Sequence, residues 1–152
     1  MDVQEFLKQK GVEFELVPHA QTFTAQEVAA TEHETGHHFA KTVVATGGAE
    51  TFMFVLPASR HVDFEKAAKL VGQKVVMASE GEMKKVFPDC EVGAEPPFGS
   101  QYGVRTYVDR ALEKCEQIVF RAGTHDRTVK MSYKAYKKLE KPKVASFAIM
   151  ED

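Results

Sequence analysis

The spacing of apolar side chains changes several times along the chain, which indicates a succession of helices and strands. Residues 3–10 carry apolar side chains at helical spacing, and Gly11 follows where such a helix would stop. Residues 12–16 then alternate between apolar and acidic side chains. The first part of the chain therefore predicts a short helix followed by a half-exposed strand.

The middle of the chain predicts a buried hairpin. Residues 41–45 and 51–56 are rich in β-branched and aromatic side chains, which is typical of strands. Gly47 and Gly48 lie between them and supply the positive φ values of a tight turn. Residues 52–56 are apolar without interruption, so the second strand is expected to be central and covered on both faces.

Capping residues and further β-rich runs complete the expected fold. Helices are predicted after the capping residues Thr24, Asp63, Ser79 and Ser132. Strands are predicted at 74–77, 104–108, 117–121 and 127–131. Because helices and strands interleave with short connections, the fold class is α/β or mixed α+β. We expect one compact domain over residues 1–152, built on one sheet with hairpins.

The composition is that of a soluble globular domain. The 152 residues are 43% apolar and 28% charged, and no apolar run approaches the roughly 18 residues of a membrane span. The charged start of the chain does not resemble a signal peptide. Cys90 and Cys115 lack the spacing of a redox or metal motif and suit a reducing compartment. We therefore expect a cytoplasmic protein without membrane association.

The net charge of −2 conceals opposite charges at the two ends of the chain. Residues 1–40 contain seven acidic side chains and two lysines, whereas residues 121–143 contain eight basic side chains and two acidic ones. Such an asymmetry points to a polyanionic partner. The candidate phosphate contacts lie on one side of the last predicted helix: Lys134, Lys137, Lys138 and Lys141.

The string His33-Glu34-Thr35-Gly36-His37 fits the H-E-x-x-H pattern of zinc hydrolases. On a helix, the two imidazoles would bind zinc and the glutamate would act as a general base. Gly36 weakens that helix, and the flanking residues lack the apolar positions that would dock it. We therefore favour a polar surface loop over a zinc centre and expect no metal and no cofactor, although His33, His37 and His38 could bind metal adventitiously.

Three other segments carry candidate binding chemistry. Lys41 begins a strand, where it either protects a sheet edge or binds an anion such as phosphate. Residues 93–99 combine glycines, Gly99 among them, with two prolines and the aromatic ring of Phe98. They either present backbone N–H groups to a carbonyl oxygen or form an ordinary rigid connection. Residues 123–126 lie between two strands, and His125 precedes an aspartate. Adjacent residues usually point apart, so a His-Asp dyad is not expected there.

The strings FAKTVV at 39–44, GAEPPFG at 93–99, YVD at 107–109 and AGTH at 122–125 occur in a familiar order. Together they resemble the YbaK-like family, also called the prolyl-tRNA synthetase-associated editing domain. The similarity extends from about residue 3 to residue 140. It implies a curved, mostly antiparallel or barrel-like sheet flanked by helices, and hydrolysis in trans of the ester bond of mischarged aminoacyl-tRNA, such as Ala or Cys on tRNA for proline.

The resemblance also implies roles for individual residues. Lys41 stands at the lysine that holds a phosphate near the terminal adenosine of the tRNA. Gly93 and Pro97 match a G-x-x-x-P loop that cradles the aminoacyl carbonyl, and Gly123 and Thr124 match the second wall of the pocket. Phe98, Gly99 and His125 adjoin these positions and complete the expected substrate-binding set. An aspartate of one cysteine-editing branch has no counterpart here, because Val129 is the nearest position.

The expected partner is the acceptor end of aminoacyl-tRNA, with transient association with translation components and a monomer or weak homodimer in solution. An aminoacyl ester is already activated, so positioning and oxyanion stabilisation could supply most of the catalysis without a protein general base. Two alternatives remain open. One is a non-catalytic module that binds tRNA, and the other is the zinc hydrolase built on His33, Glu34 and His37.

Overall fold

The computed structural model describes residues 2–18 and 39–150. The first elements are α1 (Val3–Gln9), β1 (Glu15–Pro18), β2 (Ala40–Gly47), β3 (Glu50–Pro57), β4 (Arg60–Val62), α3 (Phe64–Val71), β5 (Val76–Met77) and α4 (Glu80–Val86). They are followed by the 3-10 helix η1 (Gly99–Tyr102), β6 (Arg105–Asp109), the 3-10 helix η2 (Arg110–Lys114), β7 (Gln117–Arg121), β8 (Arg127–Ser132), α5 (Tyr133–Glu140), β9 (Lys143–Ala145) and β10 (Ala148–Met150). The helix predicted after Thr24 lies outside the described residues.

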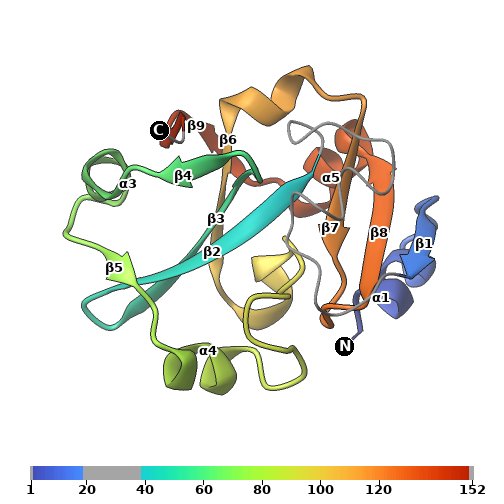
Figure 1. The fold of residues 1–152 in the computed structure, drawn as a ribbon, viewed down its shortest axis with the longest axis horizontal. Coiled ribbons are helices and arrows are strands. Elements are labelled where there is room, and N and C mark those ends of the chain that lie inside the picture. Colours follow the sequence, from blue (N-terminus) through green and yellow to red (C-terminus); the bar gives the residue numbers. More distant parts are fainter. Residues whose placement is uncertain (1, 19–38, 151–152) are drawn as a thin grey trace.

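The strands of the described ranges form three sheets, where the sequence predicted one (Figure 1). The largest has the order β5-β2-β3-β6-β9, and its β3–β6 and β6–β9 pairs are parallel. A second sheet has the order β1-β8-β7, and β10 pairs with β4 in a third. A single parallel bridge between Phe39 and Val119 joins the first two sheets just before β2 begins. The mixed α/β class is confirmed, and the single sheet is corrected to three.

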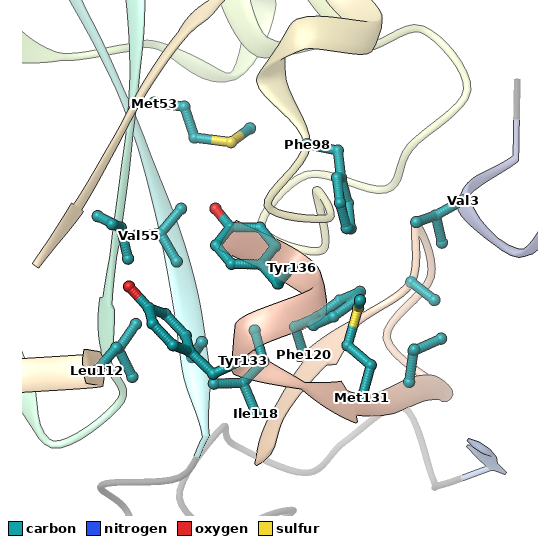
Figure 2. Close-up of a cluster of buried hydrophobic side chains, with 14 of the residues drawn as sticks. Val3, Met53, Val55, Phe98, Leu112, Ile118, Phe120, Met131, Tyr133 and Tyr136 are labelled. Atoms are coloured by element: carbon teal, nitrogen blue, oxygen red, sulfur yellow. The ribbon is translucent and has the colours of Figure 1, made fainter. Parts of the chain in front are cut away.

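Strand β3 is central, as the uninterrupted apolar run predicts. Met53 and Val55 face one buried cluster, which they share with strand β7 and helix α5 (Figure 2). Phe52 and Phe54 point to the opposite face and belong to a second cluster with helix α3. Because successive side chains of a strand point to opposite faces, a strand between two cores must be apolar at every position.

The predicted caps form as expected. The Asp63 carboxylate accepts the N–H groups of Glu65 and Lys66 at the start of α3. At α4, Ser79 and Glu82 form a reciprocal capping box, with distances of 2.8 and 3.1 Å. These local hydrogen bonds satisfy the first N–H groups of each helix, and for this reason they can be predicted from short sequence patterns.

Two local predictions need correction. The strand expected at 12–16 begins at Glu15, because the N–H of Val12 bonds to the Leu7 carbonyl and closes the end of α1. In the β2–β3 turn, only Gly48 has a positive φ, of 62°. Gly47 is needed for space instead, since a Cβ there would lie 2.8 Å from the carbonyl oxygen of Lys74.

Candidate active site

Backbone and side-chain hydrogen bonds bring three of the predicted segments together. The hydroxyl of Thr42, on β2, donates to the carbonyl oxygen of Glu95 at 2.9 Å. The N–H of Gly123 donates to the carbonyl oxygen of Ala94 at 2.9 Å, and its own carbonyl accepts the N–H of Glu91 at 2.8 Å. Thr42 and Gly123 lie about 80 residues apart in the chain, and both contact the 91–97 loop.

Lys41 is half-buried on β2, paired in register with Leu56 of β3. It is the covalent neighbour of Thr42, which contacts the loop. Ala40 and Val44 belong to the core cluster on one face of β2, and Val43 packs against the cluster on the other. The pleat of the strand thus directs Lys41 to the face of Val43, as its spacing predicts, and away from the face of Thr42.

Gly93, the first residue of the predicted G-x-x-x-P loop, has a left-handed backbone conformation. Its φ is 87°, which favours glycine, and a Cβ there would lie 3.4 Å from the His125 ring. Its N–H, a predicted donor to the substrate carbonyl, donates to Oε2 of Glu95 at 3.2 Å. In this structure, a carboxylate of the protein therefore accepts the hydrogen bond that the sequence analysis expects Gly93 to offer to a substrate.

Glu95 is the residue of the loop that the sequence analysis missed. Its side chain is only 3% exposed, although it lies between a glycine and two prolines in a turn-rich segment. Burial raises the pKa of this carboxyl, while hydrogen bonds from the backbone of Glu95 and Gly93 and the nearby His125 oppose the rise. A buried carboxyl beside a predicted substrate loop is a candidate functional group on physical grounds.

Pro97, Phe98 and Gly99 continue the loop into the core. Pro97 is buried, and Phe98 is fully buried, with its ring edge-to-face at 5.8 Å from Phe120 and 5.3 Å from Tyr136 (Figure 2). A Cβ at Gly99 would lie 2.7 Å from the carbonyl oxygen of Val104. The aromatic wall predicted at Phe98 is thus part of the hydrophobic core, and Gly99 permits a close approach within the protein.

The 123–126 turn lies against the 91–97 loop. Gly123 has a φ of 92°, and the hydroxyl of Thr124 donates to Asp126 at 2.7 Å. The His125 ring makes a 2.8 Å hydrogen bond with the Val92 carbonyl, and the backbone N–H of His125 donates to the Glu91 carboxylate at 2.6 Å. His125 therefore fastens the turn to the 91–97 loop, and its ring faces that loop rather than Asp126.

A cavity of about 230 Å³ adjoins this turn. It is lined by Asp2, Val3, Asp89, Cys90, Pro96, Tyr102, Ala122, Gly123, Thr124 and Arg127, so three of its residues come from the predicted site segments. Burial raises the pKa of Cys90 to about 11, with smaller effects from Asp89 and Glu95. A thiol with a raised pKa is a poor nucleophile at neutral pH, so Cys90 is not a candidate catalytic nucleophile.

The four candidate lysines of α5 are all exposed, but they do not have the same surroundings. Lys137 lies 3.1 Å from both carboxylate oxygens of Glu113. Lys138 lines a shallow cavity with Lys10 of α1. Lys141 ends the helix in the left-handed conformation, with a φ of 53°. These positions could contact a polyanion, with the charge of Lys137 already partly neutralised.

The residues of the zinc alternative, His33, Glu34 and His37, lie outside the described residues, as does His38. Within 2–18 and 39–150, no group of three or more His, Cys, Asp and Glu side chains could hold a metal ion. Over the same ranges, no helix has the length and apolarity needed to cross a bilayer.

Comparison with known proteins identifies the family. The sequence model of the aminoacyl-tRNA editing domain matches residues 19–139. The chain belongs to this family. The loop at Gly93, the turn at Gly123 and the strand carrying Lys41 all fall within the matched region. The expected resemblance is therefore confirmed, and the protein is an enzyme of the aminoacyl-tRNA deacylase class.

Similar proteins agree with this assignment. The Multifunctional Ser/Thr-tRNA deacylase ProXp-y of Escherichia coli (strain K12) is 25% identical over 147 residues, which cover 93% of this chain and 87% of the relative. A crystal structure described as that of a candidate trans-editing enzyme for prolyl-tRNA synthetase has a TM-score of 0.88 at 24% identity, covering 99% of this chain and 95% of that one. Hypothetical protein APE2540 has a TM-score of 0.87 at 20% identity, covering 97% of this chain and 99% of that one. The two solved structures establish the fold.

Proposed function

We propose that this editing-domain protein acts in trans and removes small amino acids from mischarged tRNA, binding chiefly the acceptor end. The observation that carries the proposal is the convergence of the 91–97 loop, the 123–126 turn and the start of β2, held by the Thr42–Glu95 and Gly123–Ala94 hydrogen bonds. One small domain offers limited surface for a whole tRNA, which favours recognition of the aminoacylated end.

The proposed substrates are tRNAs that carry amino acids with small side chains. The family resemblance suggests Ala and Cys, and the E. coli relative, a Ser/Thr-tRNA deacylase, adds Ser and Thr as candidates. The cavity beside Gly123 has a volume of about 230 Å³ and is partly polar, with Thr124 and Tyr102 among its lining residues. Tyr102 already donates to Asp89 at 2.8 Å, and Thr124 donates to Asp126. A small amino acid with a hydroxyl group could find acceptors in such surroundings.

The proposed reaction is simple ester hydrolysis. A water oxygen attacks the aminoacyl carbonyl, the ester C–O bond breaks, and the ribose oxygen leaves with a proton as the free hydroxyl group. Lys41 holds a phosphate of the terminal nucleotide, and the loop that begins at Gly93 donates backbone N–H groups to the developing oxyanion. A neighbouring ribose hydroxyl of the substrate assists the attack, so the protein supplies no general base.

The decisive experiment measures deacylation of tRNAs charged with Ala, Cys, Ser, Thr or Pro. We expect at least one small amino acid to be released much faster than Pro, and Lys41→Ala to reduce that rate at least tenfold. Lys66→Ala, an exposed lysine on α3, is the control and should not change the rate. A Lys41→Ala protein as active as the wild type would contradict the role of Lys41.

The same assay tests the alternative of a non-catalytic binding module. A pure binder would protect the ester, so its addition would slow spontaneous deacylation. Release above the spontaneous rate excludes that alternative for the tRNA tested. We further propose that the protein is a cytoplasmic monomer or weak homodimer that meets translation components transiently, and sedimentation at micromolar concentration would measure the oligomeric state.

A further inference from the structure

Within the described part of the chain, no lysine or arginine forms an ion pair with the Glu95 carboxylate. It is 3% exposed, and it accepts a hydrogen bond from the backbone N–H of Gly93 at 3.2 Å. Two ion pairs of the described residues, Arg105–Glu50 and Lys137–Glu113, lie elsewhere. A buried carboxylate with so few donors is costly, and a cationic group brought by a ligand would offset that cost.

The surroundings of Glu95 are acidic rather than basic. Pro96, the residue that follows Glu95, lines the 230 Å³ cavity together with Cys90. Asp2 and Asp89 also line this cavity, with Arg127 as the one basic lining residue. The exception close to Glu95 is His125, whose ring bonds to the Val92 carbonyl. The site thus favours a positive group over a negative one.

The aminoacyl ester carries such a group next to its reacting carbon. Its α-ammonium is separated from the carbonyl carbon by a single carbon atom. In the structure, the Gly93 N–H and the Glu95 carboxylate are likewise direct neighbours, bonded to each other. An ammonium that bonds to Glu95 can replace Gly93 as the donor, and the released N–H can then donate to the carbonyl oxygen. Through this exchange, the Glu95 carboxylate and the substrate ammonium would each gain a partner of opposite charge.

We propose that Glu95 is a specificity-determining residue that binds the α-ammonium of the substrate, so that the enzyme acts on esters of free amino acids and rejects esters without that amine. This inference rests on the proposed function. It gives a reason for the hydrogen bond between the Gly93 N–H and a buried carboxylate, and it assigns a role to Glu95 within the loop. It also predicts that the preference for substrates with the amine depends on the negative charge of Glu95 rather than on its shape.

The test compares two substrates that differ only in the amine. Alanyl-tRNA and lactyl-tRNA have the same size, and a hydroxyl replaces the ammonium in the second; seryl- and glyceryl-tRNA form the equivalent pair. Each rate is expressed relative to the uncatalysed hydrolysis of the same ester. For the amino acid that the panel identifies, we expect the wild type to prefer the amine by at least tenfold. This comparison needs no variant and is independent of folding.

Variants then test whether Glu95 is responsible for the preference for the amine substrate. Glu95→Gln keeps an acceptor for Gly93 and should lower the preference toward unity by slowing the amine substrate alone, whereas Glu95→Asp should keep part of it. Glu65→Gln on α3 is the exposed control and should match the wild type. Equal wild-type enhancement of both esters would overturn the inference and leave the proposed function intact. So would a Glu95→Gln protein that slows both esters equally. Failure to release any amino acid of the panel would overturn the proposed function, and the inference with it.

Discussion

The Thr42 hydroxyl donates to the main-chain carbonyl oxygen of Glu95 at 2.9 Å, across 53 residues of sequence. Thr42 follows Lys41 on β2, and Glu95 is the centre of the loop that carries the predicted carbonyl cradle. This one hydrogen bond therefore links the position of the candidate phosphate-binding strand to that of the loop. A partly buried bond of this type contributes about 1 kcal/mol to stability.

We expect Thr42→Val to lower kcat for deacylation several-fold with a small change in KM. Valine has nearly the shape of threonine but cannot donate, so the Glu95 carbonyl loses its partner and the loop is less firmly placed. The free energy of unfolding should fall by about 1 kcal/mol, measured by urea titration. Thr46→Val, four residues along the same strand, is the control. Equal kinetic effects of the two substitutions would contradict the role of the Thr42 bond.

The second prediction concerns the close approach at Gly99. A Cβ there would lie 2.5 Å from Oγ1 of Thr106 and 2.7 Å from the Val104 carbonyl oxygen, which is backbone and cannot move aside. Gly99→Ala should therefore destabilise the protein by about 2 kcal/mol. Gly81→Ala is the matched control, because the nearest atom to its Cβ, Oγ of Ser79, is 3.9 Å away. In the α4 helix it should stabilise by roughly 0.5 kcal/mol, so a loss of stability there would contradict the argument.

The sequence predicts those features that depend on neighbours in the chain. The caps at Asp63 and Ser79 and the central position of β3 follow from local patterns, and the structure confirms them. Gly93 and Gly123 were found from their residue type and the family resemblance, and both have the positive φ values that favour glycine.

Features that depend on distant contacts were missed. Glu95 is buried because Thr42 and Gly123 hold its loop against the protein, and no spacing near Glu95 signals this. Phe98 was expected at a pocket wall, but its ring fits between Phe6 and Tyr136, from elements about 90 residues before and 40 after it. The sequence predicts which loop carries the site, whereas only the packing shows which side chains of that loop are buried.

The third prediction concerns a buried hydroxyl in the core. The hydroxyl of Tyr136 (Figure 2) is fully buried and has no hydrogen-bond partner among residues 2–18 and 39–150. Tyr136→Phe removes this unsatisfied polar atom and should leave the stability unchanged or raise it by up to about 1 kcal/mol. Tyr102→Phe provides the contrast, since its hydroxyl donates to Asp89 at 2.8 Å and its loss should cost about 1 kcal/mol. Thermal and urea unfolding of both variants would check the opposite signs.

The fourth prediction follows from the buried carboxyl of Glu140. Burial raises its pKa above the ordinary value of 4.5, while hydrogen bonds from Ser100 and Thr106 partly oppose the rise. The folded state therefore holds the proton more tightly than the unfolded chain does. The stabilisation from this group is fully present below pH 4.5 and is lost as the pH rises through the raised pKa. Relative to Glu140→Gln, the wild type should lose stability over that interval.

Glu82 provides the control of opposite sign. Its capping hydrogen bonds with Ser79 lower its pKa, so its contribution is present above the ordinary value and is lost on acidification. Urea titrations at several pH values from 3.5 to 7.5, with Glu140→Gln and Glu82→Gln, would measure both slopes. If the stabilities of the two variants, each relative to the wild type, changed with pH in the same direction, the opposite pKa shifts assigned to Glu140 and Glu82 would be contradicted.

The last prediction concerns the basic face of α5. Lys134 and Lys138 are exposed, whereas Lys137 is paired with Glu113 at 3.1 Å. If α5 contacts tRNA phosphates, Lys134→Ala/Lys138→Ala should raise KM and reduce the slope of log affinity against log salt by about 1 to 2, because each phosphate contact releases counterions. Lys137→Ala should have a smaller effect.

The charge-matched control is Lys66→Ala/Lys69→Ala, which removes two exposed lysines from α3. It changes the net charge of the protein by the same amount, so any general electrostatic effect would appear equally in both double variants. A difference in salt slope between them assigns the contact to α5. Identical salt slopes would instead mean that the α5 lysines act only through net charge, and the phosphate contacts would have to lie elsewhere on the protein.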